Sequence, residues 1–265
     1  MAENKIEMTV TILGSGTCVP SLERSSCSVL VEAEDSKILI DCGPGTMRRL
    51  LENGTEIYDI SHILISHFHP DHTGELISFL FSNKYPDAFR RQIPLSIIGG
   101  SGLSDLYGGF KKIYGEWIDI APNILNLVEI DENNRPKVFN DLTLEMISVE
   151  HNKESLAFKI IGEKGTSLVY SGDTDYCSNL IDIAGNTNLL ICESALPDEL
   201  KVKGHLTPSE AGEIATKANV KQLVLTHFYP ECDKVDIEKQ CRRTYQGPLI
   251  LGEDLMRIYP APCAS

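Results

Sequence analysis

Short apolar runs separated by Gly, Asp and Asn recur along the chain, and they predict a succession of strands. The predicted strands are residues 8–13, 28–32, 37–40, 62–66, 94–98, 142–150, 155–161, 167–170, 189–192, 222–226 and 249–251. Longer stretches with helical spacing predict helices at residues 45–52, 74–83, 103–114, 176–184 and 208–218. The last helix has the clearest start, because Thr207 can cap it, Pro208 suits the first helical position and Glu210 completes a capping box.

Two segments of the chain share one pattern. Residues 28–46 and residues 156–174 each predict a strand, an acidic turn, a second strand and then an Asp beside a Gly. The repetition predicts a pseudo-duplicated fold with two similar halves, in which Asp41 and Asp173 occupy related places at strand ends. Of these two carboxylates, only Asp173 is placed among other candidate metal ligands.

Length and composition favour one domain. The chain has 265 residues, 42% of them hydrophobic, and its Gly and Pro residues are scattered rather than gathered into a linker, so we expect residues 1–265 to form a single domain. No apolar run approaches the ~18 residues of a membrane span, and the start of the chain lacks a secretory signal pattern. The eight cysteines form no CxxC pair, which suits free thiols. We therefore expect a cytoplasmic protein with no membrane partner.

The charge of the chain bears on its partners. A formal charge of −14 at pH 7 disfavours binding to a nucleic-acid backbone over most of the surface. Local basic exceptions could lie at residues 89–92, 111–112 and 201–203. Each of these short stretches is more typical of a solvated face than of a polyanion site.

The densest chemical signal is HFHPDH at residues 67–72, directly after a predicted strand. Residues two apart point the same way at an extended strand end, so His67 and His69 can hold one metal ion while Phe68 points into the core. Asp71 and His72, where the chain turns toward a helix, can reach a second ion. Imidazole and carboxylate ligands favour Zn²⁺, with Mn²⁺, Fe²⁺ and Co²⁺ as alternatives.

This motif, HxHxDH, resembles the signature of the metallo-β-lactamase superfamily, and later motifs follow in that family's order. His151 ends a predicted strand, Asp173 lies in YSGDT and His227 lies in LTHF. The resemblance implies a hydrolase with two divalent metal ions. The implied ligands are His67, His69 and His151 for the first ion, Asp71, His72 and His227 for the second, and Asp173 as a bridge between them. His62 is left with a structural role.

Within the superfamily, the chain is similar over nearly its whole length to the ribonuclease Z-like branch of phosphodiesterases. The matching positions are LGSGT at residues 13–17, Pro20, Arg24, LIDCG at residues 39–43, Gly45, Thr46 and KGHLT at residues 203–207. In the branch, the His of the last motif lies beside the scissile phosphate. The resemblance therefore implies that His205 steadies charge on the phosphoryl oxygens or the leaving group, and that Asp71 orients the attacking water or takes its proton.

The resemblance also implies a fold class, the four-layer αββα metallo-β-lactamase sandwich of the α/β (α+β) type, with two mixed sheets face to face and helices outside. The site is expected at one edge, where strand ends from both halves meet. We expect the pocket to be walled by the loops after Gly14 and Gly43 and by residues 79–117. Candidates to hold the ring N–H groups of the imidazoles are Ser66, Thr226 and Glu193.

The chain departs from the tRNA-processing members of the branch. Many of those carry a long flexible arm between the positions that match His151 and Asp173, whereas a predicted strand, turn and strand use residues 152–172 here. The sequence CES at residues 192–194 also departs from their His-containing motif. Together with the acidic charge, these departures favour a small phosphodiester substrate, such as a cyclic nucleotide, a cyclic ribose phosphate or a short oligonucleotide.

Other functions stay open. The first alternative is tRNA 3′ processing, which a partner subunit or a basic surface created by folding could permit. The same pair of metal ions could attack a carboxyl ester, thioester or lactone, and His205 would then be dispensable. The chain could also be an inactive metal-binding sensor module, although every metal position is filled. A redox role is disfavoured by a ligand set rich in His. Relatives commonly dimerise, so a homodimer is possible.

Overall fold

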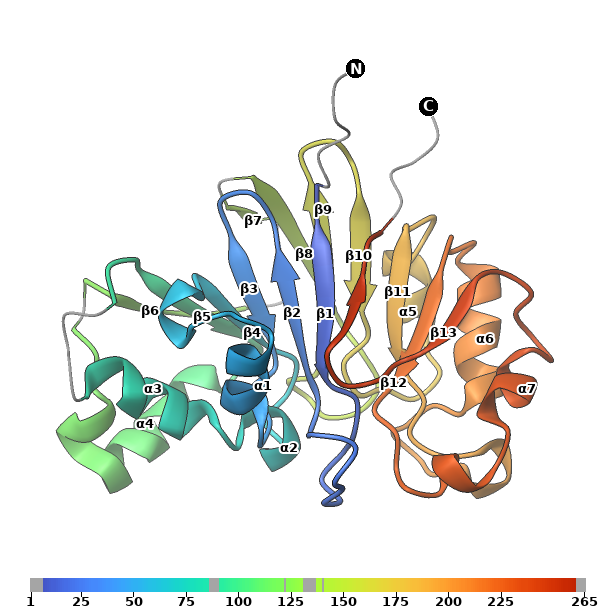
Figure 1. Cartoon of the computed structure of the whole chain (residues 1–265), viewed down its shortest axis with the longest axis horizontal. Helices are drawn as coiled ribbons and strands as arrows, with labels where there is room; N and C mark the ends of the chain where they lie inside the picture. The colour runs from blue at the N-terminus through green and yellow to red at the C-terminus, as the bar shows by residue number, and fades with distance from the viewer. Residues whose placement is uncertain (1–6, 86–90, 122, 131–136, 140, 261–265) are drawn as a thin grey trace.

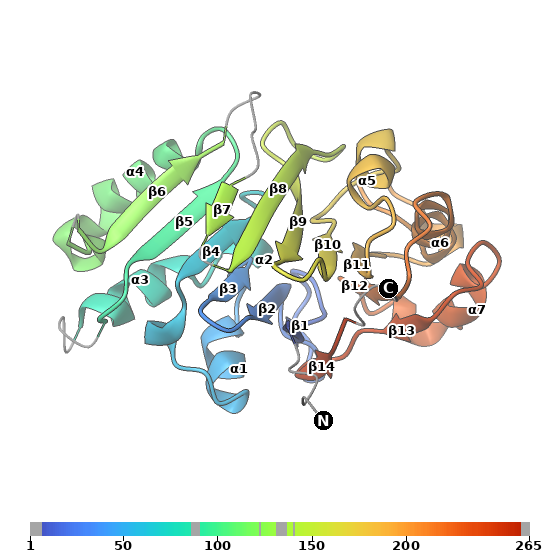
Figure 2. The ribbon, with the colours of Figure 1, turned by 90° about the horizontal axis from the view of Figure 1, so that it is seen from above.

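The computed structural model describes residues 7–85, 91–121, 123–130, 137–139 and 141–260. Two seven-stranded sheets lie face to face at the centre of the molecule. Helices cover the outer side of each sheet, so the protein has four layers (Figure 1, Figure 2). This arrangement confirms the predicted αββα sandwich with mixed sheets.

The first sheet joins the two ends of the described chain. Its strands are β1 (Thr9–Gly14), β2 (Ser28–Glu32), β3 (Lys37–Ile40), β4 (His62–Ile65), β5 (Leu95–Gly99), β6 (Leu125–Glu129) and β14 (Met256–Ile258). They follow the order β14-β1-β2-β3-β4-β5-β6. The strands from β14 to β3 pair antiparallel and those from β3 to β6 pair parallel. Val10 of β1 lies opposite Ile258 of β14, which anchors the end of the chain to its beginning.

The second sheet mirrors this plan. Its strands are β7 (Lys137–Phe139), β8 (Leu142–Ser148), β9 (Leu156–Gly162), β10 (Ser167–Tyr170), β11 (Leu189–Glu193), β12 (Leu223–Thr226) and β13 (Leu249–Leu251). The strands from β7 to β10 pair antiparallel and those from β10 to β13 pair parallel. The hairpin β2–β3 and the hairpin β9–β10 are each followed by a parallel partner, β4 and β11, which confirms the predicted repetition of two halves.

The helices differ in length and in what they cover. They are α1 (Thr46–Glu52), α2 (Pro70–Thr73), α3 (Leu76–Lys84), α4 (Leu103–Tyr114), α5 (Ser178–Ile183), α6 (Pro208–Lys217) and α7 (Ile237–Cys241). α1, α3 and α4 lie outside the first sheet and α5, α6 and α7 outside the second, while α2 lies at the edge where the strands end (Figure 1, Figure 2). α6 begins with the predicted capping box of Thr207 and Glu210. Among the helices that the structure describes, none combines the length and apolarity of a membrane span.

Buried apolar side chains form three clusters, one for each interface between layers. Ile40 and Ile191, one from each sheet, meet in the cluster between the sheets. Leu39, the neighbour of Ile40, points to the opposite face and packs with Phe79 of α3. Ile214 of α6 belongs to the third cluster, against the second sheet. Successive residues of a strand point to opposite faces, so strands covered on both sides need continuous apolar runs, which is the pattern that the sequence carries.

Every predicted strand and helix is present, with ends displaced by a residue or two. The elements that the pattern missed are β6, β7, β14, α2 and α7. β7 and β14 are three-residue strands, and α2 has four residues and α7 five, so none of them is long enough to display a period. β6 is longer, but its side chains are half-buried or exposed and so carry no apolar run.

The predicted basic exceptions are used within the fold. Arg91 is buried and donates to Asn83 and to two backbone carbonyls, so the expectation of a basic surface there is wrong for this residue. Residues 89 and 90 lie outside the described part. Lys111 pairs with Asp119, and Lys201 pairs with two carboxylates. The cysteines of the described part are free thiols, as expected.

Candidate metal centre

The seven predicted ligands gather at one edge of the two sheets. His67 follows β4, Asp173 follows β10, and His227 follows β12. The carboxyl ends of strands that run the same way lie at the same edge of a sheet, so the chain turns there repeatedly. His151, after β8, reaches this edge from the antiparallel part of the second sheet. His227 adopts a left-handed backbone, with φ of 60°, which is uncommon outside Gly and turns its ring toward the others.

A single turn of helix supplies the remaining ligands. Pro70 occupies the first position of α2 with His69 as the residue before it, and the fixed φ of proline suits that position. Asp71 and His72 follow within the turn and are both buried. The carbonyl of His72 accepts from the backbone N–H of Cys42 at 2.7 Å, so α2 is bonded to the segment that follows β3.

The first group of possible ligands contains His67, His69, His151 and Asp173, each with one ligand atom within 4.8 Å of the others. His69 Nδ1 lies 3.3 Å from His151 Nε2, and His67 Nε2 lies 3.6 Å from Asp173 Oδ2. A tetrahedral ion with bonds of about 2.0 to 2.2 Å keeps its ligand atoms about 3.4 Å apart. The observed separations match that spacing.

The second group contains Asp71, His72 and His227, again within 4.8 Å of one another. Asp173 adjoins this group too, because its Oδ1 lies 3.3 Å from the Nε2 atoms of both His72 and His227. His227 Nε2 lies 3.6 Å from Asp71 Oδ2. Asp173 therefore stands between the two groups and presents a different oxygen to each.

Unsatisfied atoms show that this cluster suits a cation. His67 Nε2 and Asp173 Oδ1 are buried and have no hydrogen-bond partner among the described residues. Buried polar atoms without a partner are costly, and both of these point at the other ligand atoms. The donor set of imidazoles and carboxylates is one that Zn²⁺ and similar divalent ions accept. The residues present therefore fit one or more metal ions.

The pKa shifts agree with a site built for positive charge. Burial together with the neighbouring His72 lowers the pKa of His67 to about 2, so its ring is neutral and free to bind a metal ion. Burial alone would disfavour a charged His72, but Asp173 and Asp41 outweigh burial and raise its pKa well above the usual value. Burial would likewise raise the pKa of Asp173, and His227 and His72 outweigh it and hold it well below.

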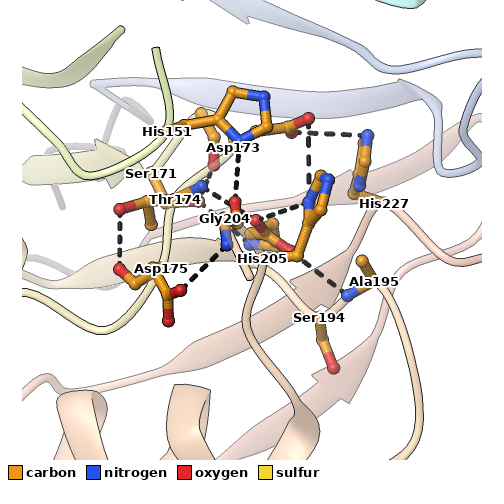
Figure 3. A network of polar contacts seen from close by, with 12 residues as sticks. His151, Ser171, Asp173, Thr174, Asp175, Ser194, Ala195, Gly204, His205 and His227 are labelled. Carbon is orange, nitrogen blue, oxygen red and sulfur yellow. Dashed lines mark hydrogen bonds and ion pairs between the residues drawn. The ribbon is translucent and has the colours of Figure 1, made fainter. Parts of the chain in front are cut away.

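Two imidazoles of the cluster are oriented by contacts at Nδ1, the ring nitrogen that faces away from the other ligands. His72 Nδ1 lies 2.7 Å from Asp41 Oδ2, which leaves Nε2 facing the cluster. His151 Nδ1 donates to the backbone carbonyl of Gly204 at 2.7 Å, which likewise turns Nε2 inward (Figure 3). Such contacts fix the tautomer of a metal-binding ring. Gly204 has a positive φ of 88°, and a Cβ at this position would lie 3.1 Å from His151, so a glycine suits the contact.

His205 lies against the cluster from the second half of the molecule. Figure 3 shows His205 beside His227 and Asp173. The rings of His205 and His227 stack with centroids 5.6 Å apart, and His205 Nδ1 is 3.0 Å from Glu193 Oε1. Burial alone would lower the pKa of His205, but the hydrogen bond and charge of Glu193 outweigh it and raise this pKa to about 9. The ring is therefore cationic at neutral pH, with Nδ1 engaged by Glu193 and Nε2 as its second donor.

The prediction that Ser66, Thr226 and Glu193 hold the imidazole rings is only partly correct. Glu193 does hold an imidazole, although it is that of His205. Ser66 Oγ donates to Asp41 and lies near the rings of His67 and His72 at 3.2 and 3.4 Å. Thr226 Oγ1 is buried without a hydrogen-bond partner in the described chain, so the expectation for Thr226 is wrong. Sequence reasoning missed the role of Asp41, although its place in the repeated pattern pointed to it.

A cavity of about 590 Å³ borders the cluster at Asp71. The loops that follow β1 and β3 line it, as expected from Gly14 and Gly43. The described residues between 79 and 117 do not line it, so that part of the expectation is wrong. Those residues belong to α3 and α4, which cover the outer face of the first sheet, and to β5, a strand of that sheet. Between His151 and Asp173 the chain forms the hairpin β9–β10, as predicted.

The two facing sheets and the His/Asp cluster at their strand ends define a metallo-β-lactamase-fold protein with a candidate metal site. The chain belongs to the family of the anti-Pycsar protein Apyc1, whose model matches residues 8–245.

The chain is similar over most of its length to several known proteins. The chain is 28% identical to the uncharacterized protein Rv1339 of Mycobacterium tuberculosis (strain ATCC 25618 / H37Rv), over 92% of this chain and 89% of that protein. It is 26% identical to a ribonuclease Z of Archaeoglobus fulgidus, over 94% of this chain and 96% of the relative. The crystal structure of the metallo-β-lactamase fold protein YhfI from Bacillus subtilis superposes with a TM-score of 0.80 at 21% identity, covering 95% of this chain and 99% of that one.

Proposed function

We propose that this protein is a two-metal phosphodiesterase that hydrolyses a small cyclic phosphodiester of the 3′,5′-cyclic nucleotide type. The observation that carries the proposal is the position of Asp173, which adjoins two groups of possible ligands and has His205 beside it. Two adjoining cation sites and a cationic imidazole suit a reaction at a negatively charged phosphate. The family to which the chain belongs supports a cyclic nucleotide as the substrate.

The ligand assignment in this proposal follows the two groups. His67, His69 and His151 would hold the first ion and Asp71, His72 and His227 the second, and Asp173, which adjoins both groups, would contribute to both sites. Zn²⁺ is the favoured ion because imidazole nitrogens dominate the set, and Mn²⁺ or Fe²⁺ would also be accepted. When bound, a pair of such ions lowers the pKa of a shared water and neutralises charge on the phosphoryl oxygens.

The protein's own groups account for the movement of protons. Hydrolysis joins a water oxygen to phosphorus, breaks one ring P–O bond and leaves a hydroxyl on the sugar. Asp71 is placed to orient the attacking water and to pass its proton on to solvent. The neighbouring His227 outweighs burial and lowers the Asp71 pKa to about 2, so the carboxylate is ionised but too weakly basic to keep the proton. His205 is placed to donate from Nε2 to the leaving oxygen, since Glu193 holds Nδ1. The imidazole would then recover a proton from solvent.

A small substrate is favoured over a folded RNA. The formal charge of −14 repels a long polyanion, and the hairpin β9–β10 uses the segment where many tRNA-processing enzymes insert their arm. The ribonuclease Z relative, matched over 94% of this chain, is the observation that supports tRNA 3′ processing as the second candidate.

The test compares substrates and two histidine variants. The metal-loaded protein is assayed on 3′,5′-cyclic UMP, bis(p-nitrophenyl) phosphate, p-nitrophenyl acetate and a precursor tRNA. His205→Ala should lower phosphodiester turnover roughly 10²- to 10³-fold while metal content, read by elemental analysis, stays unchanged. His62→Ala is the matched control, because His62 lies away from the cluster with its ring on Phe139 at 4.5 Å, and it should retain full turnover.

The outcomes separate the candidates. Turnover of the phosphodiesters that depends on His205, with the tRNA intact, supports the proposal. Cleavage of the tRNA at its 3′ end would replace it with the second candidate. Activity on p-nitrophenyl acetate alone would overturn the proposed phosphodiesterase function. Metal binding without turnover of any substrate would indicate a sensor module. Loss of metal in His205→Ala would move this residue into the ligand set.

A further inference from the structure

The cavity of about 590 Å³ borders the candidate metal centre at Asp71. Its walls are the loop between β1 and β2, the start of α1, and Pro70 and Asp71 of α2. Figure 1 shows that loop projecting beyond the strand ends on the same side as α2. Its volume lies within the range of about 300 to 1,000 Å³ that is typical of small-molecule pockets. A ligand held at the centre therefore has one adjoining space for the rest of its structure.

Backbone contacts hold these walls to the centre. The N–H of Phe228, next to His227, donates to Ser15 O at 2.9 Å, and Gly16 forms a bridge with Phe228. On the other wall, the N–H of Ser26 donates to Pro44 O at 3.3 Å. Gly43 packs so closely on α2 that a Cβ would lie 2.0 Å from Asp71 O. The cavity is thus a fixed extension of the site.

The charges around the cavity do not suit a second phosphate. Each arginine that lines it is already paired with a carboxylate. The pairs are Arg24 with Asp233 at 3.0 Å, Arg49 with Asp254 at 2.9 Å and Glu52 at 2.7 Å, and Arg48 with Glu52 at 2.9 Å. Asp71 adds a further negative charge to the lining. A second phosphate would meet these four carboxylates as well as the three arginines, whereas an uncharged group meets no such opposition.

The remaining lining is suited to a flat, weakly polar ring. Val19 and Leu22 come from the same loop and are 37% and 96% exposed, so their side chains are available to cover a ligand. The Arg48 side chain is 81% exposed, and a guanidinium plane stacks on aromatic rings even when its charge is paired. Apolar side chains and an arginine plane together form a surface on which a nucleobase packs well.

We infer that this cavity binds the nucleoside part of the substrate, with its base against Val19, Leu22 and Arg48 while the phosphate lies at the metal centre. The inference rests on the proposed function for the identity of the phosphate site. It adds a set of residues that decide affinity for the base, distinct from those that carry the chemistry. It also explains why a pocket whose arginines are paired with carboxylates adjoins a site for one phosphate.

The test compares a nucleotide with the same cyclic phosphate lacking a base. Kinetic constants are measured for 3′,5′-cyclic UMP and for methyl riboside 3′,5′-cyclic phosphate with Leu22→Ala and Arg48→Ala. In each variant the ratio of kcat/KM between the two substrates should fall about tenfold, through KM of the nucleotide. Arg48→Lys should behave like Arg48→Ala, because it keeps the charge and loses the plane. Leu51→Ala, an equally simple change at a 65% exposed leucine of α1 outside the lining, should leave the ratio unchanged.

A second measurement does not depend on turnover. Saturation-transfer NMR with uridine should show binding to the wild-type protein and a loss of that binding in Leu22→Ala. If cyclic UMP is not hydrolysed but uridine binding is lost in the variant, the proposed function fails and the pocket assignment stands. If the substrate ratio is unchanged in both variants, or if Arg48→Lys restores it fully, the assignment of a base-binding pocket is overturned.

Discussion

Asp41 and Asp173 come from matching hairpins in the two halves of the fold, and both carboxylates are almost fully buried, at 0% and 2% exposure. Asp41 accepts from the Ser66 backbone, the Ser66 hydroxyl and the Tyr170 hydroxyl at 2.8 Å each, and it contacts His72 at 2.7 Å. Asp173 Oδ1 has no hydrogen-bond partner among the described residues. The comparison teaches that two equivalent positions differ in chemistry according to how many donors the protein supplies. The carboxylate left unsatisfied is the one that remains available to a metal ion.

The difference also reflects what surrounds each strand end. Tyr170 ends β10 in the second half and yet bonds Asp41 of the first half, so one half satisfies the carboxylate of the other. Asp173 instead faces imidazoles from both halves, His72 and His227, with 3.3 Å to each. A carboxylate that accepts several hydrogen bonds can orient a metal ligand, whereas one with a free oxygen can itself be a ligand.

The largest effect on activity is expected from removing the charge of Asp173, the aspartate whose Oδ1 has no hydrogen-bond partner among the described residues. Asp173→Asn keeps the shape but removes the negative charge between the two groups. Activity should fall on the order of 10³-fold, and bound metal should fall with it, because neighbouring cations would then repel without a shared anion. Elemental analysis and a phosphodiester assay check this. Retention of the full metal content would show that Asp173 is not the bridging ligand.

A smaller effect is expected at its counterpart. Asp41→Asn leaves His72 without its anionic partner, and metal affinity should fall about 10- to 100-fold, as is usual for a residue that orients a ligand. Competition with a chelator measures the affinity. A loss of metal affinity as large as that of Asp173→Asn would contradict the prediction that Asp41 only orients a ligand whereas Asp173 is one.

The smallest effect is expected from the contact between the halves. Tyr170→Phe removes one hydrogen bond to Asp41 and one contact with Cys27 at 3.1 Å, while Ser66 and His72 still satisfy the carboxylate. The free energy of unfolding should fall by about 1 kcal/mol, since one buried hydrogen bond is lost. Denaturant titration measures this change. Metal affinity should change by less than about tenfold, and a larger loss would mean that Asp41 depends on this hydroxyl to orient His72.

The sequence predicted the main elements because their information is local. The strands β2, β3 and β10 could be predicted from their apolar runs alone. The ligands of the HFHPDH motif could be recognised because they are neighbours in the chain. The more distant residues His151, Asp173 and His227 were identified through the family resemblance, and the structure brings them to one cluster.

The missed features all depend on distant parts of the chain. β14 is three residues long and exists as a strand because it pairs with β1 at the other end of the sequence. The role of Asp41 depends on Tyr170, and the pocket depends on a loop and a helix that meet only in the folded protein.

The sequence by itself therefore determined the succession of strands and helices, the continuous apolar runs that bury each sheet on both faces, and the set of residues able to bind metal. The first two follow from local period, and the third from side-chain chemistry together with the family resemblance. Only the tertiary structure decided which of the two similar aspartates accepts hydrogen bonds from several donors, which backbone carbonyl orients His151, and where a pocket adjoins the centre. Each of these depends on groups that lie far apart in the chain, and their separation is set by the packing of the two sheets rather than by any local pattern.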